Sequence, residues 1–151
     1  MTYQNSKLII YTDGGSRGNP GPAAIGVVFK QLQGSREIIY KEYAETIGEC
    51  TNNEAEYQAV IFALKKAKAL FGKEKIKNMG VEIRLDSELL ANQLSGHYRI
   101  DEDKLKLLFV DVWNLRLDFG SVLFSYIPRE KNKQADRLLN QALNQESQKL
   151  L

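Results

Sequence analysis

The chain has 151 residues, 43% of them hydrophobic and 26% charged, which is enough to bury the core of one globular domain, and we expect a single domain over residues 1–151. Its formal charge of +2 allows a polyanionic partner without indicating one. The chain has one cysteine, Cys50, which excludes an intrachain disulfide and a zinc site made of cysteines. The absence of disulfides fits a reducing compartment, so we expect the protein in the cytoplasm. The sequence shows neither a secretory signal nor the ~20 apolar residues that cross a bilayer, so we expect no association with membranes.

The first half of the chain indicates three strands followed by a long helix. An apolar run predicts a strand over residues 7–13, which ends where a Gly- and Pro-rich segment forces a loop. Two runs rich in β-branched and aromatic residues, 23–33 and 36–46, are separated by Gly-Ser and predict a hairpin. Residues 53–71 predict a helix, because capping residues precede this segment and a glycine follows it.

The second half alternates between strands and helices. Residues 81–85 alternate between apolar and charged side chains and predict a fourth strand, which leads into a short helix starting near Ser87. Helical spacing over 105–115, a strand in "SVLFSYI" and a helix over 132–147 complete the chain. This order predicts an α/β fold with a five-stranded mixed sheet, its first three strands antiparallel and its later ones parallel, flanked by helices on both faces.

Two aspartates stand at positions where such a fold places chemistry, and a third lies near the start of the last predicted helix. Sites in these sheets form beyond the carboxyl ends of parallel strands, and there the sequence has Asp13 and Asp86. Asp136 lies in the first turns of the last predicted helix. Each also has a plain structural explanation: a turn for Asp13, a helix cap for Asp86, and a favourable interaction with the helix dipole for Asp136.

Two glutamates on the long predicted helix are separated by its periodicity. Steps of three and four residues from Glu56 reach Val60 and Ala63 on an inward stripe, whereas the same steps from Glu54 reach a mostly polar face that includes Lys65. A carboxylate on the inward stripe costs several kcal/mol to desolvate unless a cation meets it. We therefore expect Glu56 to have a cationic partner, the alternative being a capping or dipole role in the first turn.

An acidic cluster of this kind predicts a metal site. Carboxylates gathered at one point repel one another by up to ~4 kcal/mol per pair at ~4 Å, so cations must compensate them. An all-oxygen ligand set selects Mg²⁺ or Mn²⁺ over zinc. Two such ions would activate a water on one side of a phosphodiester and stabilise the departing oxygen on the other, which makes phosphodiester hydrolysis the expected chemistry.

Four ordered motifs, "YTDGGSRGNPGP", "TNNEAEYQA", "LDSELLANQLSG" and "PREKNKQADRLLNQA", resemble those of the type 1 ribonuclease H family. The resemblance runs from residue 11 to residue 142, and it is to the compact archaeal and bacterial branch, without a separate hybrid-binding domain or a basic handle. It implies a ribonuclease H-like fold and a monomer that cleaves the RNA strand of an RNA/DNA hybrid, leaving 3′-hydroxyl and 5′-phosphate ends. It also implies that Asp13, Glu56, Asp86 and Asp136 are the catalytic carboxylates that bind two metal ions, Asp13 bridging both.

The same resemblance assigns residues that bind the substrate. It implies that the RNA strand is contacted through its 2′-hydroxyl groups, which distinguish RNA from DNA, by the residues Gly14, Gly15, Ser16, Asn52 and Asn53. It further implies that Asn19 and Thr51 hold a phosphate of the DNA strand. Turn formation by Asn19 and helix capping by Thr51 are structural alternatives, and one residue can serve both purposes.

Two positions depart from the family pattern. Tyr126 stands where many members have a histidine that assists proton transfer or product release, and a phenol with a pKa of about 10 cannot relay protons near neutrality. We therefore expect reduced turnover. Glu54 stands where some relatives have a phosphate-binding arginine.

Several alternatives stay open at this stage. The chain could be a ribonuclease H-like binding module with little activity, although a pure binder has no reason to bear the repulsion of clustered carboxylates, or a nuclease that also cuts double-stranded RNA. The lysine-rich segment 65–77 reads as a solvated face or as a contact to nucleic acid. Arg129 could meet a phosphate or balance Glu130.

Overall fold

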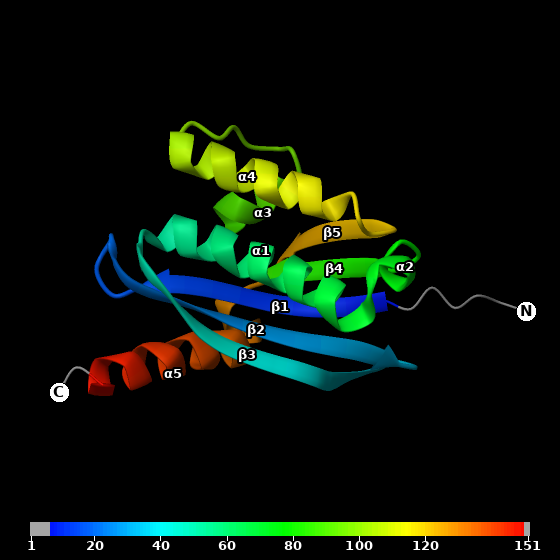
Figure 1. The fold of residues 1–151 in the computed structure, drawn as a ribbon, viewed down its shortest axis with the longest axis horizontal. Helices are drawn as coiled ribbons and strands as arrows, with labels where there is room; N and C mark the ends of the chain where they lie inside the picture. The colour runs from blue at the N-terminus through cyan, green and yellow to red at the C-terminus, as the bar shows by residue number, and fades with distance from the viewer. Residues whose placement is uncertain (1–6, 150–151) are drawn as a thin grey trace, which may run out of the picture.

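The computed structural model describes residues 7–149 and contains one five-stranded sheet in the order β3-β2-β1-β4-β5 (Figure 1). The strands are β1 (Lys7–Ser16), β2 (Gly21–Gln33), β3 (Arg36–Cys50), β4 (Gly80–Leu85) and β5 (Ser121–Tyr126). Strands β1, β2 and β3 pair antiparallel, whereas β4 is parallel to both β1 and β5. The predicted α/β fold with a mixed sheet is confirmed.

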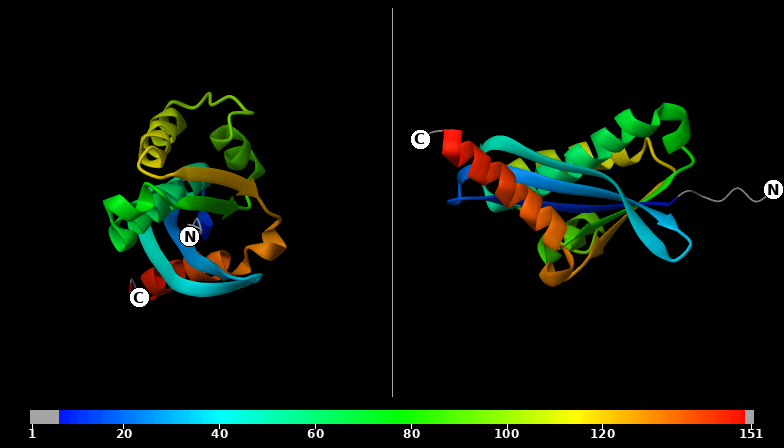
Figure 2. Two further views of the ribbon diagram at one scale, coloured as in Figure 1. Left: turned by 90° about the vertical axis from the view of Figure 1, so that its right-hand side faces the viewer. Right: turned by 90° about the horizontal axis from the view of Figure 1, so that it is seen from below.

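Helices cover both faces of this sheet, as predicted (Figures 1 and 2). The helical elements are α1 (Asn52–Phe71), α2 (Lys73–Ile76), α3 (Glu88–Leu94), α4 (Asp103–Arg116), the 3-10 turn η1 (Arg129–Lys131) and α5 (Lys133–Lys149). Side chains of α1, α3 and α4 share the main core with one face of the sheet, and α5 packs on the other face against β1, β2 and β3. None of these helices combines the length and apolar character needed to span a membrane.

Strand β2 is buried on both sides because it lies between these two helical layers. Val27 and Phe29 belong to the main core below α1, whereas Val28 between them packs against Ala135 and Leu138 of α5. Side chains of a strand point alternately to opposite faces, so the continuous apolar run of β2 serves both layers.

Two glycines let helices approach the sheet closely. A Cβ on Gly14 of β1 would overlap the carbonyl oxygen of Ala55 in α1, and a Cβ on Gly26 of β2 would overlap that of Ala135 in α5. At both places the absence of a side chain allows backbone to pack on backbone. These two contacts set the positions of α1 and α5 relative to the ends of the strands.

The structure differs from the predicted elements at several boundaries and in one added helix. Strand β1 continues past Asp13 to Ser16, because residues 14–16 pair with residues 23–25 of β2, and β3 likewise continues to Cys50. The helix α2 was not anticipated, since four residues are too few to show a helical period. The predicted order of elements therefore lacked α2, but the change leaves the sheet as expected.

Candidate metal centre

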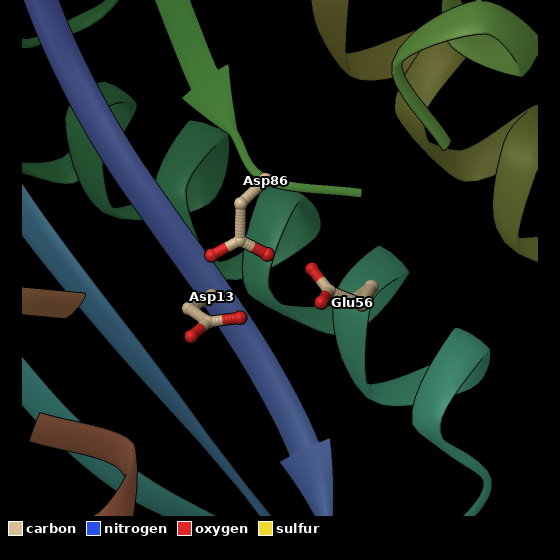
Figure 3. A group of neighbouring side chains, drawn as sticks. All are labelled: Asp13, Glu56 and Asp86. Atoms are coloured by element: carbon tan, nitrogen blue, oxygen red, sulfur yellow. The ribbon is translucent and has the colours of Figure 1, made fainter. Parts of the chain in front are cut away.

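Asp13 and Asp86 lie side by side where parallel pairing ends. The last parallel partners of β1 and β4 are Thr12 and Leu85, and each is followed directly by one of the two aspartates. Figure 3 shows both carboxylates at this edge of the sheet. The expectation that strand ends would bring these distant residues together is confirmed.

Glu56 comes to the same point from the first turns of α1. The close contact between Gly14 and Ala55 places the next residue of the helix beside Asp13. One carboxylate oxygen from each of Asp13, Glu56 and Asp86 lies within 4.8 Å of the other two (Figure 3). Three acidic side chains from three separate elements thus converge on one point.

Burial and mutual repulsion disfavour the charged forms of these three groups. Burial, followed by the charge of Asp86, raises the pKa of Asp13 to about 7. Burial raises the pKa of Glu56 well above its ordinary value, and the charge of Asp13 adds to the rise. Burial also raises the pKa of Asp86, but a hydrogen bond from Asn132 and the charge of Arg129 oppose that rise. Perturbed acidic groups that share a cavity are typical of functional sites.

Glu54 and Glu56 have the different roles that the periodicity of the helix indicated. Thr51 caps α1 and forms a capping box with Glu54, so the capping alternative applies to Glu54 and not to Glu56. Oε2 of Glu56 is inaccessible to solvent and has no hydrogen-bond partner among residues 7–149. The polar stripe predicted around Glu54 is only partly exposed, because Ile61 on it is buried.

The fourth predicted carboxylate, Asp136, lines the same cavity but lies outside the cluster of three. The cavity has a volume of about 420 Å³ and is bordered by residues of β1, α1, η1 and α5 and by the turn after β4. Oδ1 of Asp136 accepts a hydrogen bond of 3.2 Å from Asn140, one turn further along α5. The structure therefore brings all four acidic residues to one cavity and three of them into mutual contact distance.

Most of the predicted substrate-binding residues border this cavity. Gly14, Gly15, Ser16, Asn52 and Asn53 all line it, and Oδ1 of Asn52 accepts hydrogen bonds from the backbone nitrogen of Ser16 at 2.9 Å and from its hydroxyl at 3.1 Å. The end of β1 and the start of α1 are thereby fixed to each other.

Asn19 and Thr51 stand beside the cavity and are not among its lining residues. Oδ1 of Asn19 accepts a hydrogen bond of 2.9 Å from the backbone nitrogen of Asn52, and the side chain of Thr51 caps the same helix. Both residues thus have structural roles at the N-terminus of α1. Their predicted contact with a DNA phosphate stays a prediction.

Three further polar residues belong to the site, and of these only Arg129 was considered from the sequence. Arg129 lines the acidic cavity, which places its charge toward the carboxylates, and Arg17 lines it while donating to Oδ1 of Asn144 at 2.6 Å. Asn132 holds Asp86 at 3.0 Å. The signal for Asn132 was its place at the start of the last helix, four residues before Asp136 and so on the same helical face.

Tyr126 does not line the cavity, although it pairs with Leu85, the residue before Asp86. It is half exposed at the end of β5. The lysine-rich segment 65–77 begins nine residues after Glu56 and continues past the C-terminal end of α1, and nine helical residues span roughly 14 Å. Lys66 in that segment lies over the rings of Tyr43 and Phe62, which favours its reading as a structural surface.

Comparison with known proteins extends over almost the whole chain. A family model described as "Reverse transcriptase-like" matches residues 11–142, a range that contains all four acidic residues. Ribonuclease HI of Halobacterium salinarum is 42% identical over 141 residues, which cover 93% of this chain and 66% of that protein. A bifunctional protein of Mycobacterium tuberculosis is 36% identical over 142 residues, which cover 94% of this chain and only 37% of that protein.

Solved structures share the fold as well as the sequence. The crystal structure of LC11-RNase H1 in complex with an RNA/DNA hybrid matches with a TM-score of 0.85 and 43% identity, over 92% of this chain and 98% of that chain. The similarity therefore includes the sheet and the helices that carry the acidic residues.

Proposed function

Because the chain belongs to the type 1 ribonuclease H family, we propose that it is an endonuclease that hydrolyses the RNA strand of RNA/DNA hybrids with two divalent ions, Mg²⁺ or Mn²⁺. The products would carry 3′-hydroxyl and 5′-phosphate ends. The observation that carries the proposal is the convergence of Asp13, Glu56 and Asp86 within 4.8 Å, in a cavity that Asp136 also lines. The hybrid bound to the similar LC11 enzyme supports the class of substrate.

The chemistry of the ligand set fits divalent cations. The cluster offers only carboxylate oxygens, which Mg²⁺ and Mn²⁺ prefer, and it has no histidine or cysteine that would favour zinc. The buried Oε2 of Glu56, for which the described residues provide no hydrogen-bond donor, is an unsatisfied acceptor that a cation would satisfy. When bound, two ions would supply Lewis-acid activation of a water and neutralise charge on the scissile phosphate.

Different residues around the acidic cavity would bind the ions, the RNA strand and the phosphate groups. Asp13, Glu56, Asp86 and Asp136 would hold the ions, Asp136 after turning its carboxylate from Asn140 toward the cluster. Residues 14–16 with Asn52 and Asn53 form the wall that would contact the 2′-hydroxyl groups of the RNA strand. The guanidinium of Arg129, a residue that lines the acidic cavity, would meet phosphate oxygens of the substrate.

Cleavage assays with matched substrates test the proposal. Purified protein is incubated with end-labelled RNA/DNA hybrid, double-stranded RNA and double-stranded DNA of one sequence, each with EDTA, Mg²⁺ or Mn²⁺. We expect metal-dependent cutting of the RNA strand of the hybrid. Cutting of double-stranded RNA as well would widen the substrate range. Binding of the hybrid without cutting, with either metal, would identify a binding module and overturn the proposed activity.

A further inference from the structure

Asn132 is a buried polar residue that joins the acidic centre to the rest of the fold. It lies between η1 and α5, and only 1% of its surface is exposed. Its side-chain nitrogen donates one hydrogen bond to the carbonyl oxygen of Thr12, at 2.9 Å, and one to Oδ2 of Asp86, at 3.0 Å. An amide nitrogen carries two protons, so both donors are used. Asn132 therefore ties the end of β1 to the carboxylate that follows β4.

The orientation of this amide is set by its partners. A carbonyl oxygen and a carboxylate are acceptors, so the nitrogen of Asn132 must face them and its oxygen must point away. That oxygen is buried, and residues 7–149 offer it no hydrogen-bond donor. An unsatisfied buried polar atom costs about 1–3 kcal/mol, which offsets part of the stability that the two donated hydrogen bonds contribute. The contact with Asp86 connects this buried amide to the acidic cluster.

The backbone of Asn132 acts on the other side of the same cavity. Its carbonyl oxygen accepts a hydrogen bond of 3.2 Å from the backbone nitrogen of Asp136, in the first turn of α5. The side chain thus holds one acidic residue while the main chain begins the helix that carries another. A change of this side chain that leaves the helix intact separates the two effects.

We propose that Asn132 is a positioning residue of the metal centre: it fixes the Asp86 carboxylate in the orientation that binds a divalent cation, and its removal weakens cation affinity. The inference rests on the proposed function, because it takes the acidic cluster to be a cation site. With one oxygen already held, the carboxylate loses less rotational freedom when a cation binds. Outer-shell hydrogen bonds of this kind typically contribute ~10–100-fold in metal affinity or activity.

The test compares Asn132→Ala with a matched buried amide elsewhere in the fold. Gln93 is 5% exposed, accepts a hydrogen bond of 2.7 Å from the hydroxyl of Tyr57 and donates one of 3.2 Å to the carbonyl oxygen of Arg99, but it does not line the acidic cavity. Gln93→Ala therefore removes a buried bridging amide without touching a carboxylate. Mn²⁺ binding is measured by isothermal titration calorimetry on each full-length protein without substrate, and thermal unfolding is measured in EDTA.

We expect Asn132→Ala to raise the dissociation constant for Mn²⁺ by about 10–100-fold, whereas Gln93→Ala lowers the unfolding temperature and leaves that constant at the native value. Equal dissociation constants for Asn132→Ala and native protein, or equal increases in the two variants, would overturn the proposal. If Asn132→Ala does not fold, Asn132→Ser, whose shorter side chain cannot bridge Thr12 and Asp86 but whose hydroxyl can cap α5, is measured in its place.

Calorimetry separates this inference from the proposed function. If native protein binds Mn²⁺ but cuts no hybrid, the proposed activity fails, and the comparison of dissociation constants still decides the role of Asn132. If native protein binds no Mn²⁺, the positioning role is refuted, whatever the cleavage assay shows.

Discussion

Glu54 and Glu56 stand two residues apart on α1, in environments that give them different tasks. Glu54 is hydrogen-bonded within the capping box of Thr51, where a carboxylate stabilises the start of a helix. Glu56 lies in the acidic cluster with one oxygen buried and without a donor among the described residues. Glu54 contributes to folding, whereas ionised Glu56 costs stability that a proton or a bound cation would restore.

Substitution of the two glutamates should therefore have opposite effects. We expect Glu56→Gln to lower metal-dependent cleavage by more than the ~100-fold that outer-shell changes cost, without loss of stability in EDTA, because a poorly solvated charge is removed. We expect Glu54→Ala to lower the free energy of unfolding by about 1 kcal/mol and to keep the native half-saturating Mg²⁺ concentration. Urea unfolding and Mg²⁺ titrations of cleavage measure both quantities. A stable, fully active Glu56→Gln protein would contradict the assignment.

Tyr126 tests how much an absent histidine matters. The residue is half exposed at the end of β5 and does not line the acidic cavity, so a ring at this position has to reach the substrate from the rim. We expect Tyr126→His to raise turnover at neutral pH by about tenfold, less than the ~10²–10⁴-fold of a well-placed acid–base group. Tyr126→Phe, which cannot exchange a proton at all, should match the native rate. A Tyr126→His protein no faster than native at neutral pH would refute the expectation.

At the scale of elements, Gly26 couples the position of α5 to the sheet. A Cβ on Gly26 would overlap the carbonyl oxygen of Ala135, so the helix that carries Asp136 would have to move away. We expect Gly26→Ala to lower the free energy of unfolding by about 1–3 kcal/mol and to reduce cleavage even at saturating Mg²⁺.

Gly80→Ala is the control for that substitution. A Cβ on Gly80 would lie 3.2 Å from the hydroxyl of Ser121, at the end of β4 away from the acidic cavity, and this side chain can rotate. Urea unfolding measures the stability of both variants, and single-turnover assays measure their cleavage rates. If the two alanine proteins are equally stable and equally active, α5 is not held in the way that Gly26 implies.

The elements also show which parts of this molecule were predictable from sequence. Hydrophobic periodicity and strand boundaries can be recognised within short segments of the sequence. They were enough to predict the mixed sheet, the helix α1, and the convergence of Asp13 with Asp86. The extension of β1 to Ser16 depends on pairing with β2, and Gly-rich composition alone indicates a loop there. Asn132 forms hydrogen bonds with Asp86 and Thr12, which lie 46 and 120 positions earlier in the sequence, and no local sequence pattern predicts such contacts. The position of Asp136 outside the cluster of three likewise follows from a side-chain orientation.

At the scale of the whole molecule, the acidic cluster is a local excess of negative charge in a chain of net charge +2. The three clustered carboxylates have raised pKa values in the folded protein, with burial as the largest cause. Folding therefore opposes their ionisation, and the ionised cluster stores free energy that a bound cation would release. Stability, pH and metal concentration must be linked in this protein.

The sign of that linkage is fixed by the direction of the shifts. An acid whose pKa is higher in the folded state binds its proton more tightly there, so it favours folding at low pH, and this contribution is lost as the pH rises through the folded-state value. For Asp13 that window extends from its ordinary value of 3.8 to about 7. A shift of this size corresponds to at most about 4 kcal/mol, shared with the residues that interact with Asp13.

Thermal and urea unfolding of native protein and Asp13→Asn test this linkage. In EDTA, we expect native protein to lose stability relative to Asp13→Asn between pH 5 and pH 8, because only native protein must ionise residue 13 at the higher pH, and the charge of Asp13 also opposes ionisation of Glu56. Saturating Mg²⁺ should restore native protein at pH 8 by about 2.7 kcal/mol at a concentration of ~100 times the dissociation constant. It should have little effect on native protein at pH 5, where protons compete with the cation for the carboxylates, or on Asp13→Asn at either pH. Parallel pH profiles for the two proteins in EDTA would mean that Asp13 is not the strained acid inferred from its burial.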